Sequence, residues 1–150
     1  MVRGSAAAPP ARRRPRSKRP APGPRVLRPI AGEALDVRPS PTGDVGTVFS
    51  GDGMEVVWVR KAGERIDAEW FVPESVDLLT VLRGRLRVEF KDRRWRTRVL
   101  EPGDVLVLPR RTACRAYRWP RTSRAPTVFL AIYPKRPLPR RNNEARPGPG

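Results

Sequence analysis

The chain has 150 residues and a formal net charge of +17, with 32 lysines and arginines against 15 aspartates and glutamates. It contains no histidine, which excludes every histidine-ligated metal site and every histidine-based catalytic triad. Its single cysteine, Cys114, excludes an internal disulfide and is typical of a reducing compartment. No apolar run approaches the roughly 18 residues of a membrane helix, and no signal peptide is recognisable. We therefore expect a cytoplasmic protein that does not enter a membrane.

The two ends of the chain differ in composition from its middle. Residues 1–25 carry eight basic and no acidic side chains among prolines and alanines, and residues 135–150 are also rich in proline and arginine. Such segments have little apolar surface to bury, so we expect a disordered basic arm and a disordered tail. The arm is expected to bind nucleic acid non-specifically through its charges. Residues 26–45 are interrupted by proline and glycine, which predicts an irregular lead-in.

From Gly46 onward the sequence alternates between apolar and polar residues with a period of two. This alternation predicts strands over 46–50, 54–60, 68–72, 77–84, 85–90, 94–100, 105–109, 113–119 and 127–134. The segments between them carry turn residues such as Gly-Asp-Gly and Glu-Pro-Gly-Asp. No stretch shows helical periodicity. Strands of this number and spacing predict an all-β antiparallel sandwich or small barrel.

Alternation also predicts which side chains face outward. Leu86 and Val88 are expected to point inward, and in the 94–100 strand Trp95 and Val99 are expected to do the same. The arginines of these two strands would then face one another across the sheet as a ladder of Arg85, Arg87, Arg94, Arg96 and Arg98. Such a ladder is either a solvated outer face or a surface for phosphate groups, including those of nucleic acid, or for an acidic partner.

Two segments resemble the signature motifs of the cupin superfamily: GERIDAEWFVPESVDLLTVLRG at 63–84 and GDVLVLPRRTACRAYR at 103–118. Gly63 and Gly84 match the ends of the first motif, and Gly103 and Pro109 match the second. The resemblance covers residues 46–134 and implies a double-stranded β-helix barrel, or jelly roll. It also implies that a homodimer is compatible with the fold.

The metal-binding positions of the resembling proteins are replaced in this chain. Many cupins hold one divalent metal by three histidines and a glutamate. Glu69 and Phe71 stand at the first two histidine positions, Asp77 at the glutamate position and Cys114 at the third histidine. Arg118 replaces an asparagine of the second motif. We therefore expect the cupin frame without a metal and without a cofactor.

The same resemblance and strand parity predict a set of cavity side chains. Cys114 and Arg118 share a face that looks into the cavity of the resembling barrels. Cys114 is interpreted either as a small buried wall residue or as a reactive thiol. Glu69 and Asp77 could act as general acid and base, or could be paired with Arg118 and Arg65. The candidate ligand-cavity residues are therefore Arg65, Glu69, Phe71, Asp77, Cys114 and Arg118.

Three functions compete on these grounds. The first, which the erased metal site favours, is a metal-free cupin-like protein that binds a small ligand or a partner without catalysis, so no catalytic residue is assigned. The second is an enzyme, either an isomerase or lyase that uses Glu69 and Asp77 or an oxygenase with an unusual metal site. The third is a nucleic-acid-associated accessory protein that uses the basic arm and the arginine ladder.

Overall fold

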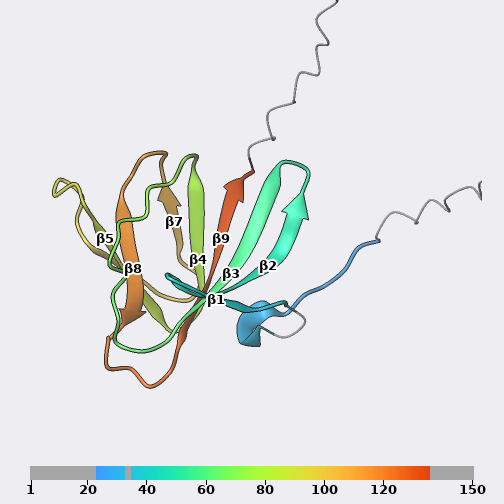
Figure 1. The fold of residues 1–150 in the computed structure, drawn as a ribbon, viewed down its shortest axis with the longest axis horizontal. Helices are drawn as coiled ribbons and strands as arrows, with labels where there is room; N and C mark the ends of the chain where they lie inside the picture. The colour runs from blue at the N-terminus through green and yellow to red at the C-terminus, as the bar shows by residue number, and fades with distance from the viewer. Residues whose placement is uncertain (1–22, 33–34, 136–150) are drawn as a thin grey trace, which may run out of the picture.

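The computed structural model describes residues 23–32 and 35–135, which form an antiparallel β-structure (Figure 1). Its strands are β1 (Arg38–Ser40), β2 (Gly43–Gly51), β3 (Met54–Lys61), β4 (Asp77–Arg83), β5 (Arg85–Phe90), β6 (Arg98–Leu100), β7 (Val105–Leu108), β8 (Cys114–Trp119) and β9 (Thr127–Pro134). A 3-10 helix, η1 (Pro29–Ala31), precedes them. Within these residues no helix is long and apolar enough to cross a membrane. Most of the arm and nearly all of the tail expected to be disordered lie outside the described residues.

The strands form two sheets that face each other, as in a double-stranded β-helix. The larger sheet has six strands in the order β1-β2-β3-β9-β4-β7, and the smaller has three in the order β6-β5-β8. In Figure 1 the smaller sheet stands on one side of the fold and β2 and β3 stand on the other. Strands far apart in the sequence become neighbours in the larger sheet, because β9 returns from the end of the fold to lie between β3 and β4.

Gly84 allows the chain to pass from the larger sheet to the smaller one between β4 and β5. Its φ is 73°, and an added Cβ would lie 3.1 Å from the carbonyl oxygen of Pro126. A side chain at this position would meet both a left-handed backbone and a steric conflict. The crossing is held from the other side by Thr127, whose hydroxyl donates a 2.6 Å hydrogen bond to the carbonyl of Arg85.

The core is formed by the inner faces of both sheets. Alternate positions of β4 and β5 supply its centre, as period-two packing requires. Its fully or nearly buried members are Val59, Leu79, Val81, Leu86, Val88, Leu100, Leu108, Cys114 and Phe129. Their burial is the main stabilising contribution, because each large apolar side chain removed from water contributes about 1.5–3 kcal/mol.

The lead-in covers part of the outer face of the larger sheet. Trp58, which points away from the core, is fully buried there. Gly32, with a φ of 72°, lies so close to the Trp58 ring that a Cβ would approach it to 3.0 Å. The segment expected to be irregular therefore contributes packing, and it also contains β1 and the start of β2.

Two predicted strands differ from the structure. Residues 68–72 form no strand and keep only a bridge between Phe71 and Cys114, because the segment leads directly into Pro73, which has no amide to donate. The 94–100 strand shortens to β6, because the Asp92 carboxylate accepts the amide and guanidinium of Arg94 and holds that residue in a turn. The inward parity was also wrong: Val99 pairs with outward-facing Arg87 and is 42% exposed, whereas Leu100 is buried.

Candidate functional site

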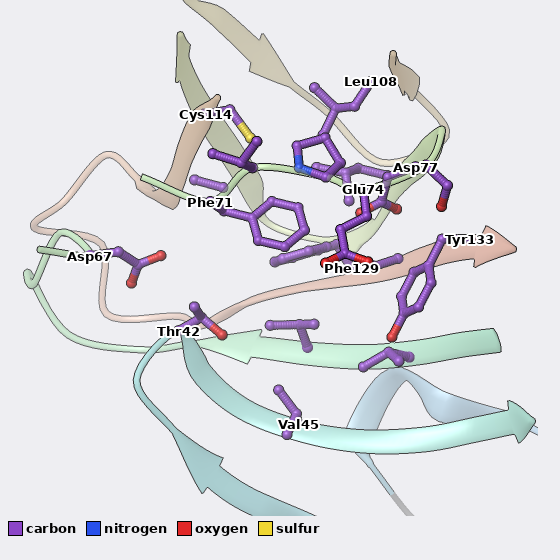
Figure 2. A pocket seen from close by; sticks show the side chains of 18 of the residues that line it. Thr42, Val45, Asp67, Phe71, Glu74, Asp77, Leu108, Cys114, Phe129 and Tyr133 are labelled. Carbon is purple, nitrogen blue, oxygen red and sulfur yellow. The ribbon is translucent and has the colours of Figure 1, made fainter. Parts of the chain in front are cut away.

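A cavity of about 540 Å³ lies between the two sheets (Figure 2). Its walls come from alternate residues of neighbouring strands: Val57 and Val59 of β3 lie opposite Ala131 and Phe129 of β9. The segment between β3 and β4 supplies part of the rim, including Phe71 and Glu74. The apolar lining consists of Val45, Val57, Val59, Phe71, Val72, Pro73, Leu79, Leu108, Ala116, Phe129, Ala131 and Pro134.

Asp77 is the buried acid of this cavity. It is the first residue of β4, lies opposite Leu108 of β7 and is only 3% exposed. Its Oδ1 atom has no hydrogen-bond partner among the described residues. Burial raises the pKa of its carboxyl from 3.8 to about 6, and the backbone amides of Leu78 and Ile132 partly oppose this shift. Near neutral pH the cavity therefore holds a carboxylate that no protein donor satisfies fully.

A buried ion pair lies in the same cavity wall. Lys61, the last residue of β3, donates from Nζ to Oδ2 of Asp67 over 2.6 Å, and the two side chains are 9% and 18% exposed. Burial lowers the pKa of the Lys61 ammonium, and its contact with Asp67 opposes that shift. The charge of Lys61 is thus already compensated by a protein carboxylate.

Cys114 is a wall residue of the cavity and is only 2% exposed. Its amide and carbonyl exchange two 2.9 Å hydrogen bonds with the backbone of Phe71, which places both side chains at the cavity. Burial first, and then the charge of Asp77, raise the pKa of the thiol to about 11, while the charge of Lys61 opposes the shift. A thiol that stays protonated at neutral pH is a poor nucleophile, so Cys114 offers the cavity a small apolar surface.

Three of the six residues predicted for the cavity line it, and three do not. Phe71, Asp77 and Cys114 belong to the lining. Arg65 and Glu69 are exposed and lie outside it, because the segment that carries them is not a strand and has no strand parity. Arg118 has the expected inward parity opposite Leu86 and is buried, but its guanidinium donates to the carbonyl of Arg121 at 2.8 Å, beyond the cavity. Among the described residues Asp77 is therefore not paired with Arg65 or Arg118.

Sequence reasoning missed several polar groups of the cavity, chiefly Lys61, Asp67 and Tyr133. The alternation of the strands could have predicted two of them. Lys61 follows Val57 and Val59 at intervals of two residues, and Tyr133 follows Phe129 and Ala131 in the same way. Asp67 follows no such period, because it reaches Lys61 from the irregular segment after β3.

The residues present do not fit a cupin-type metal. Of the four positions that correspond to metal ligands in the resembling proteins, Glu69 lies outside the cavity and Phe71 presents a ring without a donor atom. Asp77 and Cys114 alone face the cavity with oxygen and sulfur. In the part of the chain that the structure describes, no three histidine, cysteine, aspartate or glutamate side chains come together as a metal site, whereas a stable site needs three or four ligands.

The expected arginine ladder is not formed. On the outer face of the smaller sheet Arg85 pairs with Trp119, and Arg87 pairs with Tyr117 on one side and Val99 on the other. The Arg87 guanidinium stacks 4.2 Å from the Trp119 ring. Arg94 and Arg96 precede β6, and Arg98 lies opposite Val88. The ladder prediction was wrong because it assumed a seven-residue strand where the structure has three.

Comparisons with known proteins agree with this architecture. The sequence matches no protein-family model and no curated protein. A solved structure from Ralstonia eutropha JMP134, of a protein proposed to be a mannose-6-phosphate isomerase, has a TM-score of 0.58 and 19% identity, and the match covers 75% of this chain and 100% of that one. KdgF from Halomonas sp. gives 0.54 at 20% identity, with 68% and 89% covered.

A third solved structure is of an RmlC-like cupin family protein from Methanocaldococcus jannaschii, described as having a double-stranded β-helix fold. It gives a TM-score of 0.52 at 10% identity and covers 65% of this chain and 84% of its own. At such identities a likeness shows the fold alone and not the activity. Together with the two facing sheets and the two motifs, it shows that this chain has the double-stranded β-helix fold of the cupin superfamily.

Proposed function

We propose that this protein binds a small organic molecule with a largely apolar body inside its barrel, without a metal and without converting it chemically. The observation that carries this proposal is the cavity of about 540 Å³ with its mainly aliphatic and aromatic wall. Small-molecule sites commonly have volumes of roughly 300–1,000 Å³ and few polar groups. The cavity therefore has the size and the lining of such a site.

The metal-free part of the proposal is supported by the ligand set. Asp77 and Cys114 offer only two ligand side chains between them, and the thiol pKa of about 11 disfavours the thiolate that a metal would need. Elemental analysis of untagged protein should find far less than one equivalent of iron, manganese, nickel, copper or zinc. One tightly held ion per chain, lost in Asp77→Ala, would contradict this.

The substrate named for the Ralstonia protein is a sugar phosphate, and this cavity does not favour one. A buried phosphate needs uncommitted cations. Lys61 is paired with Asp67, and Lys135 at the rim donates to Ser50 over 3.0 Å and lies 3.8 Å from the Glu55 carboxylate. Among the described residues that line the cavity these are the two cations, and both have partners. We therefore do not extend that substrate to this chain.

A cavity-filling variant tests the binding proposal. Ala131→Trp projects an indole into the cavity from the middle of β9, whereas Leu130→Trp places the same ring on the opposite face of the strand. Titration with benzyl alcohol, followed by NMR, should show binding to the wild type and to Leu130→Trp. The affinity of Ala131→Trp should be at least about tenfold weaker, because the ring occupies the ligand's space. Unchanged binding by Ala131→Trp would contradict the cavity as the site.

One observation favours a second candidate, metal-independent proton transfer. The Asp77 pKa of about 6 lies in the range useful for a general base at neutral pH. Glu69 cannot be the second catalytic carboxylate, because it lies outside the cavity. Incubation of a bound ligand in deuterated water separates the two functions: a base would exchange a carbon-bound hydrogen in the wild type and not in Asp77→Asn, whereas a binding protein leaves the ligand unlabelled.

A further inference from the structure

The cavity of this strongly basic protein carries a buried negative charge without a cationic partner among the described residues. Asp77 is 97% removed from solvent, since 3% of it is exposed, and its Oδ1 has no partner within the described residues. An unsatisfied buried carboxylate oxygen costs free energy, of order 1–3 kcal/mol or more. A ligand group that donates a hydrogen bond to this carboxylate, which lines the cavity, would recover part of that cost.

The surroundings of Asp77 reinforce its charge. Glu74 and Tyr133 lie on the same side of the cavity as Asp77, and Asp67 lies apart from them (Figure 2). The pKa of the Tyr133 hydroxyl is raised by burial first, then by the negative charges of Glu55 and Asp77, so the charge of Asp77 acts on this side of the cavity. This part of the cavity favours a positive group over a negative one.

Aromatic rings line the same cavity. Phe71 and Phe129 present phenyl rings to it, and Tyr133 presents a phenol. The faces of such rings attract cations within about 6 Å of the ring centre. Lys61, the buried cation of the wall, is not counted as a cation for these rings, because its ammonium binds Asp67 at 2.6 Å.

From these observations we infer that the cavity selects ligands that carry a protonated amine on an apolar body, with Asp77 as the hydrogen-bonded counter-ion of the amine. The inference rests on the proposed function and specifies its ligand class. The N–H groups of an ammonium donate to the Asp77 carboxylate, the carboxylate balances the charge, and the rings contact the apolar body and the cation. Carboxylate and phosphate ligands are disfavoured by the same groups.

Three probes of matched shape test the selectivity: benzylamine, benzyl alcohol and benzoate. We expect wild-type protein to bind benzylamine at least about tenfold more tightly than benzyl alcohol, the effect of one charge-assisted hydrogen bond, and benzoate most weakly. In Asp77→Asn the affinity for benzylamine should fall about tenfold, while that for benzyl alcohol changes less than about threefold. Glu64→Gln is the charge-matched control, because Glu64 is exposed and outside the cavity.

A fourth probe, benzyltrimethylammonium, separates charge from hydrogen bonding. It keeps the positive charge but has no N–H, so we expect it to bind more weakly than benzylamine. Equal affinity of the wild type for benzylamine and benzyl alcohol, or an amine preference that survives in Asp77→Asn, would overturn the selectivity while leaving the small-molecule site in place. Absence of binding by every probe would overturn both. The ranking in the wild type decides the question even if Asp77→Asn folds poorly.

Discussion

The cavity and the outer face of the smaller sheet both carry half-buried or buried charged side chains, but these side chains differ in their hydrogen-bond partners. On the outer face Glu89 accepts hydrogen bonds from the Tyr117 hydroxyl at 2.7 Å and from Arg115 at 3.2 Å. Arg115 also stacks 4.1 Å from Trp70, and Arg87 stacks on Trp119. In the cavity Lys61 and Asp67 are paired, whereas Asp77 has an oxygen without a partner.

The difference separates an acid that is hydrogen-bonded within the fold, Glu89, from an acid that has an unsatisfied oxygen, Asp77. On the outer face Glu89 is hydrogen-bonded to Tyr117 and Arg115, and Arg87 and Arg115 stack on aromatic rings, although the Nε atoms of both arginines have no hydrogen-bond partner among the described residues. Asp77 costs stability where it stands, and strongly perturbed groups in cavities are typical of functional sites. The net charge of +17 therefore does not describe the cavity, whose two lysines are paired and whose buried carboxylate, Asp77, has no cationic partner among the described residues.

Breaking the buried ion pair should have the largest effect on stability. Asp67→Leu leaves the Lys61 ammonium buried without its carboxylate, and we expect the free energy of unfolding to fall by about 2–4 kcal/mol. The double variant Lys61→Met/Asp67→Leu should recover most of that loss, because it removes both charges. Urea denaturation measures both values. A neutral Asp67→Leu would show that Lys61 can reach water without its partner.

Asp77→Asn should act in the opposite direction. The folded-state pKa of Asp77 is about 6 and its ordinary value is 3.8, so between these values the folded protein binds a proton that the unfolded chain releases. The stability of the wild type therefore falls as the pH rises through this window and stays lower above it. At pH 7 asparagine removes this cost, and we expect the free energy of unfolding to rise by about 1–2 kcal/mol. This gain is smaller than the free energy that corresponds to the full pKa shift, because the cavity is open to water.

The pH dependence of that gain checks its cause. Near pH 4 the wild-type carboxyl is protonated in the folded protein, so Asp77→Asn and the wild type should have nearly equal stability there. Glu64→Gln, on the surface, should show no such dependence. A gain for Asp77→Asn that is as large at pH 4 as at pH 7 would indicate packing rather than charge.

Much of the fold could be predicted from the sequence, because apolar and polar residues alternate clearly in a strand that has one buried and one exposed face. The bounds expected for 85–90 and 127–134 are those of β5 and β9. Alternation failed where a local hydrogen bond competed with it: the Asp92 carboxylate captures Arg94 and ends the regular pattern of arginines before β6. A period-two pattern does not reveal such side-chain capture of the backbone.

The site could be predicted only in part, for a related reason. Asp77 and Cys114 lie on regular strands at positions that the cupin motifs mark, so their places follow from the pattern. Glu69 occupies a motif position in a segment that the structure does not form as a strand. The partner of Lys61 comes from that irregular segment too, and its path depends on tertiary contacts such as that of Trp70 with Arg115.

A smaller effect on stability is expected from replacing Glu89, the acid on the outer face of the smaller sheet. Burial, first, and the hydrogen bond to Glu89, second, raise the pKa of Tyr117 to about 12. Glu89→Gln keeps an acceptor but removes the negative charge, so the Tyr117 pKa should fall while remaining above its ordinary value. The loss of stability should be about 1 kcal/mol, since Glu89 and Arg115 are partly exposed. Ultraviolet titration of tyrosine ionisation follows the pKa, with Tyr133→Phe as the background that isolates Tyr117.

The smallest effect should come from the arginines before β6. Arg94 and Arg96 are exposed, and the ion pair of Arg94 with Asp92 is between side chains that are 84% and 41% exposed. Replacing both arginines with threonine should change the free energy of unfolding by less than about 0.5 kcal/mol, because exposed pairs contribute little. Arg87→Thr is the informative contrast: it removes the guanidinium stacked on Trp119 and should cost about 0.5–1 kcal/mol. Equal costs for the two changes would mean that stacking contributes nothing on this face, and a large cost for the loop pair would mean that the loop arginines have partners like those of Arg115.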